Sequence, residues 1–435
     1  MKKNVLVFSS APYPGVQICR WLKDNLLFNP IAAASYPNHS QFVAKDCICN
    51  IPFVYEENFV TFLNEVIVEY DIEFVIPTDD TIALVLTEKS NLINAVIVSS
   101  PYETAKICRY KSLTYNTLWG KYYVPRVFSS SIEVGNEDFP LFAKPDEGQG
   151  SRGARKINCR EELNEVLSEK RNMVICEYLD GEEYTVDCFT DRNGHLLFIN
   201  PRRRSRVQYG ISVRAESVND IDEFETIVKD INKCISFRGY WFVQLKRDKY
   251  GNLRLMELCT RFSGTFAHSQ GYGVNLPLLA LCDFAGMDVS VIKNDYSVVS
   301  DKSFIDRYSI GYDYSRVYID YDDTITSNGG DFVNTAVMAF LYQCRNKNRE
   351  IILLTRHSKS KSNSLVEDME RHAIPIGLFD QIIELAWEDE KSNKIDTKKK
   401  SIFIDNSFAE RKKVAVVHKI PVFDVAHVEC LYDWR

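Results

Sequence analysis

A lysine and three glycines in the first half of the sequence have types and spacing that suit phosphate binding. In FAKPDEGQGSRGARK, an apolar run ends on Lys144, whose ammonium group can reach a phosphate. Gly148, Gly150 and Gly153 follow and allow a tight loop whose amides can approach phosphate oxygens. The lysine precedes the glycines, so this is not the Walker arrangement. A glycine-rich surface hairpin would show the same pattern, so the segment alone leaves phosphate binding and a plain structural role as alternatives.

Oxygen ligands for a divalent cation occur further along the chain. The segment FVQLKRDKYGNLRLMELCTRFSG reads as two strands joined by a turn at Asp248 to Asn252. Gln244 and Glu257 then lie on paired strands, where a carbonyl and a carboxylate oxygen face each other as the hard ligands that Mg²⁺ prefers. Arg261 follows as a positive charge for phosphoryl oxygens.

The last third of the sequence holds a second group of chemically capable side chains. RVYIDYDDTIT is an apolar strand that ends in two carboxylates, Asp320 and Asp322, which strand alternation points the same way. One can attack phosphorus as a nucleophile while the other handles the proton of the leaving group. IILLTRH ends a later strand on Thr355, and KSIFIDNS ends another on Asp405. Because parallel strands bring such ends to one rim, we expect these four residues to form one site.

The elements that position these residues follow from the apolar pattern. Strand-like and helix-like runs alternate over residues 1–100, which predicts an open parallel α/β sheet covered by helices. Residues 101–300 contain several predicted strands in succession, a pattern typical of α+β proteins. After a polar stretch at 293–306 that we interpret as a linker, a new βαβ series with a helix at 331–346 occupies residues 310–435. The chain therefore has three predicted domains.

Composition narrows the class of protein. Of 435 residues, 45% are apolar and 26% charged, and the net charge of −7 argues against a broad nucleic-acid surface. No run approaches the roughly 18 apolar residues of a membrane span, and the four-residue apolar run at 5–8 is a strand rather than a signal peptide. Twelve scattered cysteines without a CxxC pair predict a reduced, cytoplasmic protein. The charge and the lack of an apolar span predict no nucleic-acid or membrane partner.

Taken in order, the motifs of residues 1–290 resemble the ATP-grasp superfamily, most closely the branch that includes carbamoyl phosphate synthetase. The resemblance implies a Rossmann-like domain followed by two α+β lobes that hold ATP between them. It also implies a reaction that joins a carboxylate to an amine or another nucleophile through an acyl phosphate and releases ADP.

The resemblance also implies roles for single residues. Lys111, in RYKSLTYNTL, matches the early nucleotide-contacting lysine of the family, and Lys144 matches the second one. The loop Gly148 to Gly153, with Gly150 and Ser151, matches the flexible phosphate lid. The residues that match the adenine-reading hinge and the ribose-binding acid are Cys176, Glu177, Tyr178 and Leu179 for the hinge and Glu183 for the acid.

Two features of this half need separate interpretation. The family usually reads Glu-x-Asn-x-Arg where this chain has Glu257, Cys259 and Arg261, and the soft sulfur of cysteine is a poor ligand for Mg²⁺ or Mn²⁺. The metal set is then Gln244 and Glu257. The run PRRRSRVQYGISVR is either a solvated basic face or an anion-binding site, and we favour catalytic roles for Arg204 and Arg206 because guanidinium groups bind carboxylate and phosphate in a fork.

Residues 315–435 resemble the haloacid-dehalogenase (HAD) superfamily. The resemblance implies that Asp320 is phosphorylated, Asp322 acts as acid and base, Thr355 binds the phosphate, and Asp320, Asp322 and Asp405 hold Mg²⁺. The charge-screening lysine is Lys391, with Lys394 as second choice. Asn406 replaces a second acid, for which Glu410 could compensate, and the absence of a long insertion predicts a capless HAD-like Rossmannoid domain. His357 is interpreted as a surface or supporting residue.

Three functions are consistent with these features. The first is an ATP-grasp ligase fused to a Mg²⁺-dependent phosphatase, with both parts acting on one small-metabolite or sugar pathway and with a small carboxylate and amine, or a phosphorylated compound, as substrates. The second is an ATP-grasp kinase with a phosphatase domain. The third is a nucleotide-sensing protein with degenerate sites. A homodimer is compatible with each of them.

Overall fold

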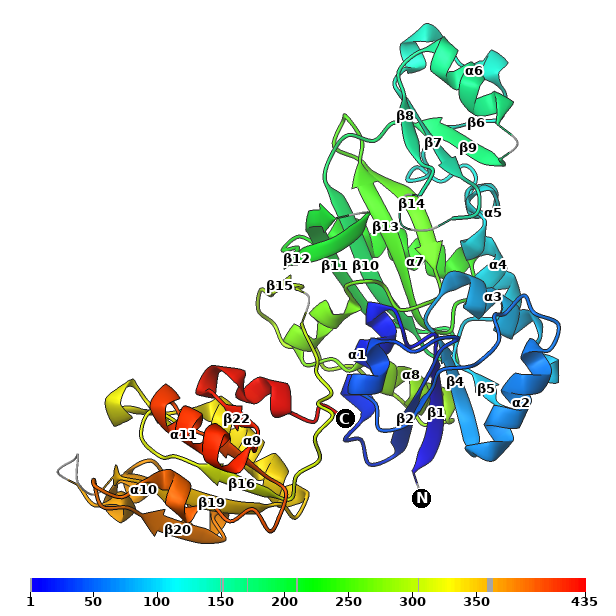
Figure 1. Cartoon of the computed structure of the whole chain (residues 1–435). Helices are drawn as coiled ribbons and strands as arrows, with labels where there is room; N and C mark the ends of the chain where they lie inside the picture. Colours follow the sequence, from blue (N-terminus) through cyan, green and yellow to red (C-terminus); the bar gives the residue numbers. More distant parts are fainter. Residues whose placement is uncertain are drawn as a thin grey trace. The chain divides into compact units, whose positions relative to one another are not determined.

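The computed structural model describes residues 2–148, 150, 152–169, 171–208, 210–303, 305–357 and 363–435. The chain divides into two units, residues 1–304 together with residue 435, and residues 305–434 (Figure 1). The finer division of the first unit into residues 1–100 and 101–300 stays a prediction. Within the described ranges, no helix is long and apolar enough to cross a membrane.

The first unit begins with a five-stranded parallel sheet in the order β3-β2-β1-β4-β5. The alternating strand and helix pattern predicted this sheet, although its last strand is only two residues long. The apolar residues of β1 are buried on both faces, against α1 on one side and α2 on the other. The strands and helices are β1 (Lys3–Phe8), α1 (Tyr13–Leu22), β2 (Phe28–Ala33), β3 (Cys47–Ile48), α2 (Phe59–Glu69), β4 (Ile72–Pro77), α3 (Asp80–Glu88) and β5 (Val96–Ile97).

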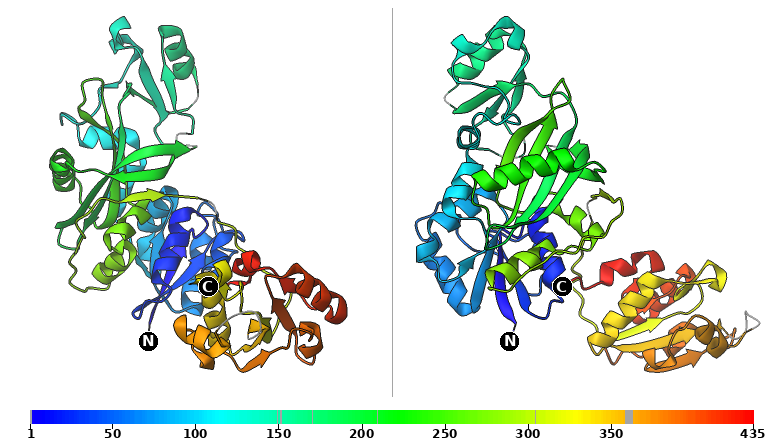
Figure 2. Two further views of the ribbon diagram at one scale, coloured as in Figure 1. Left: turned by 90° about the vertical axis from the view of Figure 1, so that its left-hand side faces the viewer. Right: turned by 180° about the vertical axis from the view of Figure 1, so that it is seen from behind.

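A six-stranded antiparallel sheet forms the centre of the first unit. Figure 2 shows α7 (Asp222–Cys234) lying across this sheet, and the helix buries Phe224 and Ile227 against it. The opposite face carries the polar residues described below and packs partly against α1 and α8 (Leu276–Phe284). In order, the strands are β14 (Leu253–Cys259), β13 (Gly239–Arg247), β10 (Glu183–Thr190), β11 (Leu196–Gln208), β12 (Ile211–Ser217) and β15 (Val299–Asp301).

Two segments of this sheet differ from the sequence interpretation. The arginine run does not follow a strand but lies within β11, because its arginines find acidic partners on both faces of the sheet. The stretch interpreted as a linker contributes β15, whose Ser300 pairs with Ala215 at the edge of β12. An exposed edge strand needs no apolar pattern because its stability comes from main-chain hydrogen bonds, so the sequence gives little sign of it.

A smaller four-stranded sheet, in the order β6-β9-β7-β8, completes the first unit. Figure 1 shows α6 beside this sheet, and Leu163 and Val166 of the helix pack against Leu141 and Ile157. The elements are α4 (Tyr102–Arg109), α5 (Lys111–Thr117), β6 (Val127–Phe128), β7 (Leu141–Pro145), β8 (Arg155–Ile157), α6 (Arg160–Ser168) and β9 (Met173–Glu177).

The second unit is a five-stranded parallel sheet in the order β20-β19-β16-β21-β22. The helix predicted at 331–346 begins only at Thr335, where the side chain of Asn334 accepts a hydrogen bond from Val337 N. The preceding residues pair in a short hairpin instead. The elements are β16 (Arg316–Ile319), β17 (Thr326–Ser327), β18 (Phe332–Val333), α9 (Thr335–Asn346), β19 (Glu350–Thr355), α10 (Leu365–Arg371), β20 (Gln381–Glu384), β21 (Ser401–Ile404), α11 (Phe408–His418) and β22 (Val422–Phe423).

Candidate functional site

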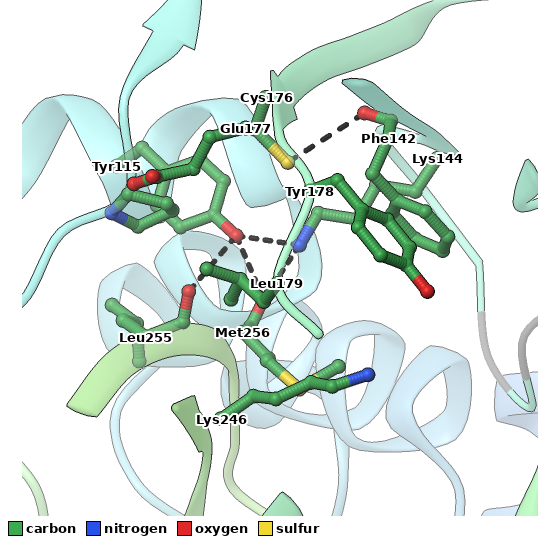
Figure 3. Close-up of a pocket in the computed structure, with 11 residues that line it drawn as sticks. Tyr115, Phe142, Lys144, Cys176, Glu177, Tyr178, Leu179, Lys246, Leu255 and Met256 are labelled. Carbon is green, nitrogen blue, oxygen red and sulfur yellow. Dashed lines mark hydrogen bonds between the residues drawn. The ribbon is translucent and has the colours of Figure 1, made fainter. Parts of the chain in front are cut away.

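An apolar pocket lies where the small sheet faces the large one (Figure 3). The small sheet contributes Phe142 from β7 and the segment Cys176–Leu179, which continues β9. The large sheet contributes Lys246 from β13 and Met256 from β14. Apolar walls with main-chain groups at one edge suit a planar heterocycle. The predicted hinge residues therefore line one wall of a real cavity.

Lys144 reaches this pocket from β7 and is held by the large sheet. Its ammonium group donates to Tyr115 Oη at 2.5 Å and to the carbonyl of Met256 at 2.9 Å (Figure 3). The carbonyl of Met256 is available because the residue is an extra one in β14, where the register with β13 shifts. Tyr115 also donates to this carbonyl at 2.9 Å, and burial raises the pKa of its phenol well above the usual value. The tyrosine therefore remains a donor.

The hinge itself is fixed by its neighbours. The carboxylate of Glu177 accepts a hydrogen bond from Arg126 N at 2.9 Å, which ties β9 to β6. The ammonium groups of Lys156 and Lys246 lie 4.5 Å and 6.0 Å from the centroid of the Tyr178 ring. The carboxylate of Glu177 is therefore committed to the neighbouring strand, and base binding by the main chain of the hinge stays a prediction.

A second cavity lies beside the first and is lined by charged groups. Its residues are Asp80, Cys108, Arg109, Lys111, Gly148, Glu257, Cys259 and Arg261. The ammonium group of Lys111 donates to the carbonyl of Gly148 at 3.3 Å, and burial lowers the lysine pKa, with Glu257 opposing. In the described part of the chain, the carboxylate of Glu257 has no hydrogen-bond or ion-pair partner. Three cationic side chains, those of Arg109, Lys111 and Arg261, therefore line the same cavity as the carboxylate of Glu257.

Arg261 is held in this cavity by a residue from the first sheet. Its Nε donates to Asp80 Oδ2 at 2.8 Å, and its guanidinium lies 5.4 Å from the centroid of the Phe242 ring. Asp80 is the first residue of α3. The orientation of the predicted catalytic arginine therefore depends on an element about which the local motif says nothing.

Arg204 contacts both the predicted ribose-binding acid, Glu183, and one predicted metal ligand, Gln244. Nη1 of Arg204 donates to Glu183 Oε1 and, at 2.9 Å, to Gln244 Oε1. Nη2 donates to the carbonyl of Gly210 at 2.9 Å. Arg206 lies outside this group: it is half exposed and pairs with Asp301 at 2.8 Å. The structure thus brings Arg204 into the site and leaves Arg206 at the surface.

The glycine-rich loop has the backbone that its sequence predicts. Gly150 and Gly153 have φ values of 65° and 76°, in the left-handed region that favours glycine. A Cβ added at Gly153 would lie 2.4 Å from Arg171 Nη1, the movable end of a long side chain, so the φ value rather than a lack of room favours glycine here. Ser151, the other predicted contact of this loop, lies outside the described residues.

Sequence reasoning missed the residue that joins this loop to Lys111. Asp146 is buried, and its carboxylate accepts from Ser112 N at 2.8 Å, Ser112 Oγ at 2.9 Å and Asn172 Nδ2 at 3.1 Å. Its carbonyl accepts from Lys111 N at 3.2 Å. Asp146 therefore fixes the start of α5 against the strand that carries Lys144. An acid two residues after a predicted phosphate-binding lysine was the available signal.

In the second unit, one lysine joins two of the predicted acids. Lys391 Nζ lies 2.7 Å from Asp320 Oδ1 and 2.7 Å from Asp405 Oδ2. Asp320 follows β16 and Asp405 follows the neighbouring strand β21, so their carboxyl ends meet at one rim. Burial raises the pKa of Asp320 to about 6, with Lys391 opposing it. Lys394, the second choice for this lysine, is exposed.

The remaining residues of the rim take separate positions. Asp322 does not share the lysine; it pairs with His357, whose Nδ1 lies 3.0 Å from Asp322 Oδ1. His357 is fully buried, so it supports the acid rather than lying at the surface. Thr355 Oγ1 is buried without a hydrogen-bond partner among the described residues, as a phosphate-binding hydroxyl would be. Glu410 pairs with Arg356 at 3.1 Å, and Asn406 is exposed.

The two sites differ in how they fit a divalent cation. Across the described ranges, no three acidic, histidine or cysteine side chains form a ready-made cage. At the rim of the second unit, Asp320 and Asp405 both contact the ammonium group of Lys391, and their two carboxylates are the ligand type that Mg²⁺ prefers, so they fit one such cation beside the lysine. In the first unit Glu257 fits, whereas the oxygen of Gln244 is already bonded to Arg204 and Cys259 offers sulfur.

One segment of the chain matches a known protein family. Residues 169–303 match the sequence model of a family described as ATP-grasp in the biosynthetic pathway with Ter operon. No curated protein matches the chain.

Three solved structures are similar in fold. The biotin carboxylase domain dimer of Hydrogenobacter thermophilus 2-oxoglutarate carboxylase, in complex with MgADP, ADP and bicarbonate, has a TM-score of 0.57 at 16% identity, over 69% of this chain and 74% of that one. N5-carboxyaminoimidazole synthetase from Staphylococcus aureus, complexed with ADP, has a TM-score of 0.55 at 16% identity, over 66% and 79%. L-amino acid ligase from Bacillus licheniformis has a TM-score of 0.51 at 18% identity, over 65% and 74%.

The first unit thus has a mixed α/β fold with one cavity between two of its sheets and a second cavity lined by three cationic side chains. With the family match and these structures, that fold is the one of the ATP-grasp superfamily, as the sequence motifs predicted. None of these findings names a haloacid dehalogenase, so the resemblance of the second unit stays a prediction.

Proposed function

We propose that the first unit is an ATP-dependent ligase that joins a small carboxylate to an amine, or a related nucleophile, and releases ADP. The observation that carries the proposal is the adjacency of two cavities that share β14: the apolar one holds Met256 and Lys144, and the charged one holds Glu257, Lys111 and Arg261. Solved structures of similar fold include a biotin carboxylase domain with MgADP, an N5-carboxyaminoimidazole synthetase with ADP, and an L-amino acid ligase.

In this proposal each residue has a defined task. The hinge Cys176–Leu179 reads the base through main-chain groups, and Lys144 and Lys111 bind phosphate oxygens from opposite sides of the site. Glu257 holds the cation. Arg261, fixed by Asp80, offers its remaining N–H groups to the phosphoryl group that passes to the substrate carboxylate. Bound Mg²⁺ would supply charge neutralisation for that transfer.

We further propose that the second unit is a phosphatase of the phospho-aspartate type. Asp320 is the nucleophile, and Asp322 moves the proton of the leaving group, with His357 holding its carboxylate. Lys391 lies between Asp320 and Asp405, and its positive charge favours the ionised form of Asp320. The unpartnered hydroxyl of Thr355 is available for a phosphate oxygen. Bound Mg²⁺ would lower the negative charge that meets at the rim.

One experiment separates this function from its two alternatives. The full chain with Asp320→Asn is incubated with ATP, Mg²⁺ and a panel of carboxylates and amines, and ADP, AMP and new amide bonds are measured. A ligase forms ADP and an amide only when both substrates are present. ADP with a phosphorylated product and no amide would indicate a kinase. Nucleotide binding without turnover would indicate a sensor, and AMP formation would refute the acyl phosphate route.

Variants of the phosphate-binding residues test the same proposal. Lys144→Ala removes the charge between β7 and β14, and Glu257→Ala removes the one available carboxylate, so each should abolish substrate-dependent ADP formation. Ser168→Ala, on the exposed face of α6, is a matched surface control and should leave it unchanged. A homodimer, which one of the similar structures forms, is tested by the mass of the chain in solution.

A further inference from the structure

The face of the large sheet near Glu257 carries a side-chain cation where the predicted metal ligands lie. Gln244 and Glu257 are direct partners in the register of β13 and β14, as the sequence predicted. Arg204, on β11, reaches across the intervening strand β10 to the oxygen of Gln244 at 2.9 Å and to Glu183. Its side chain is only 6% exposed, so its charge is confined to this face. The oxygen of Gln244 that a metal cation would need is thus already bonded to Arg204.

The remaining donors are too few for two divalent cations. Glu257 is the one predicted ligand with an uncommitted oxygen among the described residues, and Cys259, on the same face of β14, offers sulfur, which Mg²⁺ does not favour. Mg²⁺ in nucleotide sites is commonly held by one or two carboxylates together with substrate phosphates. Glu257 with the phosphates therefore meets the needs of one cation and not of a second.

We infer that Arg204 supplies, at this face, the positive charge that a second divalent cation would otherwise bring, so that the site takes one divalent cation for each nucleotide. The inference rests on the proposed nucleotide-binding function. A guanidinium is suited to the task because it keeps its charge when buried and binds carboxylate, amide and phosphate oxygens in a fixed fork. Its third anchor is the carbonyl of Gly210, between β11 and β12, which accepts a hydrogen bond from Nη2 at 2.9 Å.

Counting bound Mn²⁺ tests the inference without measuring activity. The full chain is titrated with Mn²⁺ and followed by electron paramagnetic resonance, with and without one equivalent of a non-hydrolysable ATP analogue. The difference gives the number of cations that depend on nucleotide and removes any Mn²⁺ bound by the second unit. We expect one. Two would overturn the inference and leave the proposed function standing. No binding of the analogue by calorimetry would remove the proposed function and the inference together.

Variants of neighbouring arginines test the role of the side chain. Arg204→Met frees the oxygens of Gln244 and Glu183, so we expect analogue affinity to fall at least tenfold and the count to rise from one to two at high Mn²⁺. Arg203→Met is the matched control: Arg203 is adjacent, lies on the opposite face and pairs with Glu216, so count and affinity should stay as in the wild type. Arg204→Lys keeps the charge, should fold if Met does not, and should keep the count at one. Wild-type affinity and a count of one in Arg204→Met would overturn the inference.

Discussion

Asp146 offers the sharpest test of how the nucleotide site is built. Its carboxylate accepts three hydrogen bonds, two from Ser112 and one from Asn172, and is 5% exposed. In Asp146→Asn the volume is retained, but the new amide faces the amide of Asn172, donor to donor. The side chain at position 146 then has one acceptor oxygen for the three donors of Ser112 and Asn172, which previously shared two. The start of α5, which carries Lys111, loses its anchor to the strand of Lys144.

The magnitude follows from the hydrogen bonds at risk. A hydrogen bond to a charged group contributes roughly 1.5–3 kcal/mol, and an unsatisfied buried donor costs about 1–3 kcal/mol. Asp146→Asn should therefore lower the free energy of unfolding of the first unit by about 2 kcal/mol, and Asp146→Ala by roughly twice that. Because Lys111 is displaced, the Kd for a non-hydrolysable ATP analogue should rise about tenfold or more, which corresponds to about 1.4 kcal/mol.

A variant of a second buried aspartate, Asp248, distinguishes an effect on stability from an effect on nucleotide binding. Asp248 is also 5% exposed and accepts hydrogen bonds from Tyr250 N, Asn252 N and Arg254 Nε, but it closes the turn between β13 and β14 and lines neither cavity. Asp248→Asn should lower stability by a similar amount and leave the Kd unchanged. Urea unfolding and isothermal calorimetry measure the two quantities. Equal Kd changes in both variants, or a wild-type Kd in Asp146→Asn, would refute the reasoning.

Three further predictions concern single side chains. Cys259→Asn offers Glu257 a hard neighbouring oxygen, so the Mg²⁺ concentration for half-maximal ADP formation should fall; an unchanged requirement would place the residue away from the cation. Asp320→Asn keeps the shape of the rim but removes the nucleophile, so hydrolysis of an aryl phosphate by the full chain should fall to background while ATP use persists. Burial, with a smaller effect of Arg202, lowers the pKa of His268 from 6.5 to about 4. This folded pKa lies below the unfolded one, so stability is lost as the pH falls through this range. Between about pH 7 and about pH 5, urea unfolding of the wild type should lose about 2 kcal/mol more than His268→Gln; equal losses would show that His268 titrates normally.

The parts of the fold that sequence could predict are those set by local patterns. The first sheet, the paired strands that carry Gln244 and Glu257, and the parallel strands that end in Asp320 and Asp405 all follow from the spacing of apolar residues. The arginine run was harder to interpret, because a run of like charges is typical of a solvated face. Only the acidic partners on neighbouring strands make that run a stable strand.

The parts of the site that sequence could not predict depend on contacts between distant positions. Asp80 and Arg261 are 181 residues apart, and Tyr115 meets the carbonyl of Met256 across 141. Such partners have no motif of their own, because an aspartate after a strand or a tyrosine on a helix is ordinary in most folds. Gln244 illustrates the converse. Its spacing suited a metal ligand, but the structure commits its oxygen to Arg204.

Both units use a cation of the chain to hold acidic groups together. Lys391 lies between Asp320 and Asp405, and Arg204 joins Glu183 to the face that carries Glu257. Carboxylates this close repel one another, and burial strengthens the repulsion because the local dielectric is low. A fixed ammonium or guanidinium removes most of that cost and keeps the oxygens aligned. The difference lies in which ligands remain for a metal ion: beside Lys391 there are still two carboxylates, whereas Arg204 takes up the oxygen of Gln244 and leaves Glu257. On the proposed functions, the second unit should therefore keep its arrangement of acids without Mg²⁺ and need the cation for the reaction, whereas the first unit needs it chiefly for binding the nucleotide.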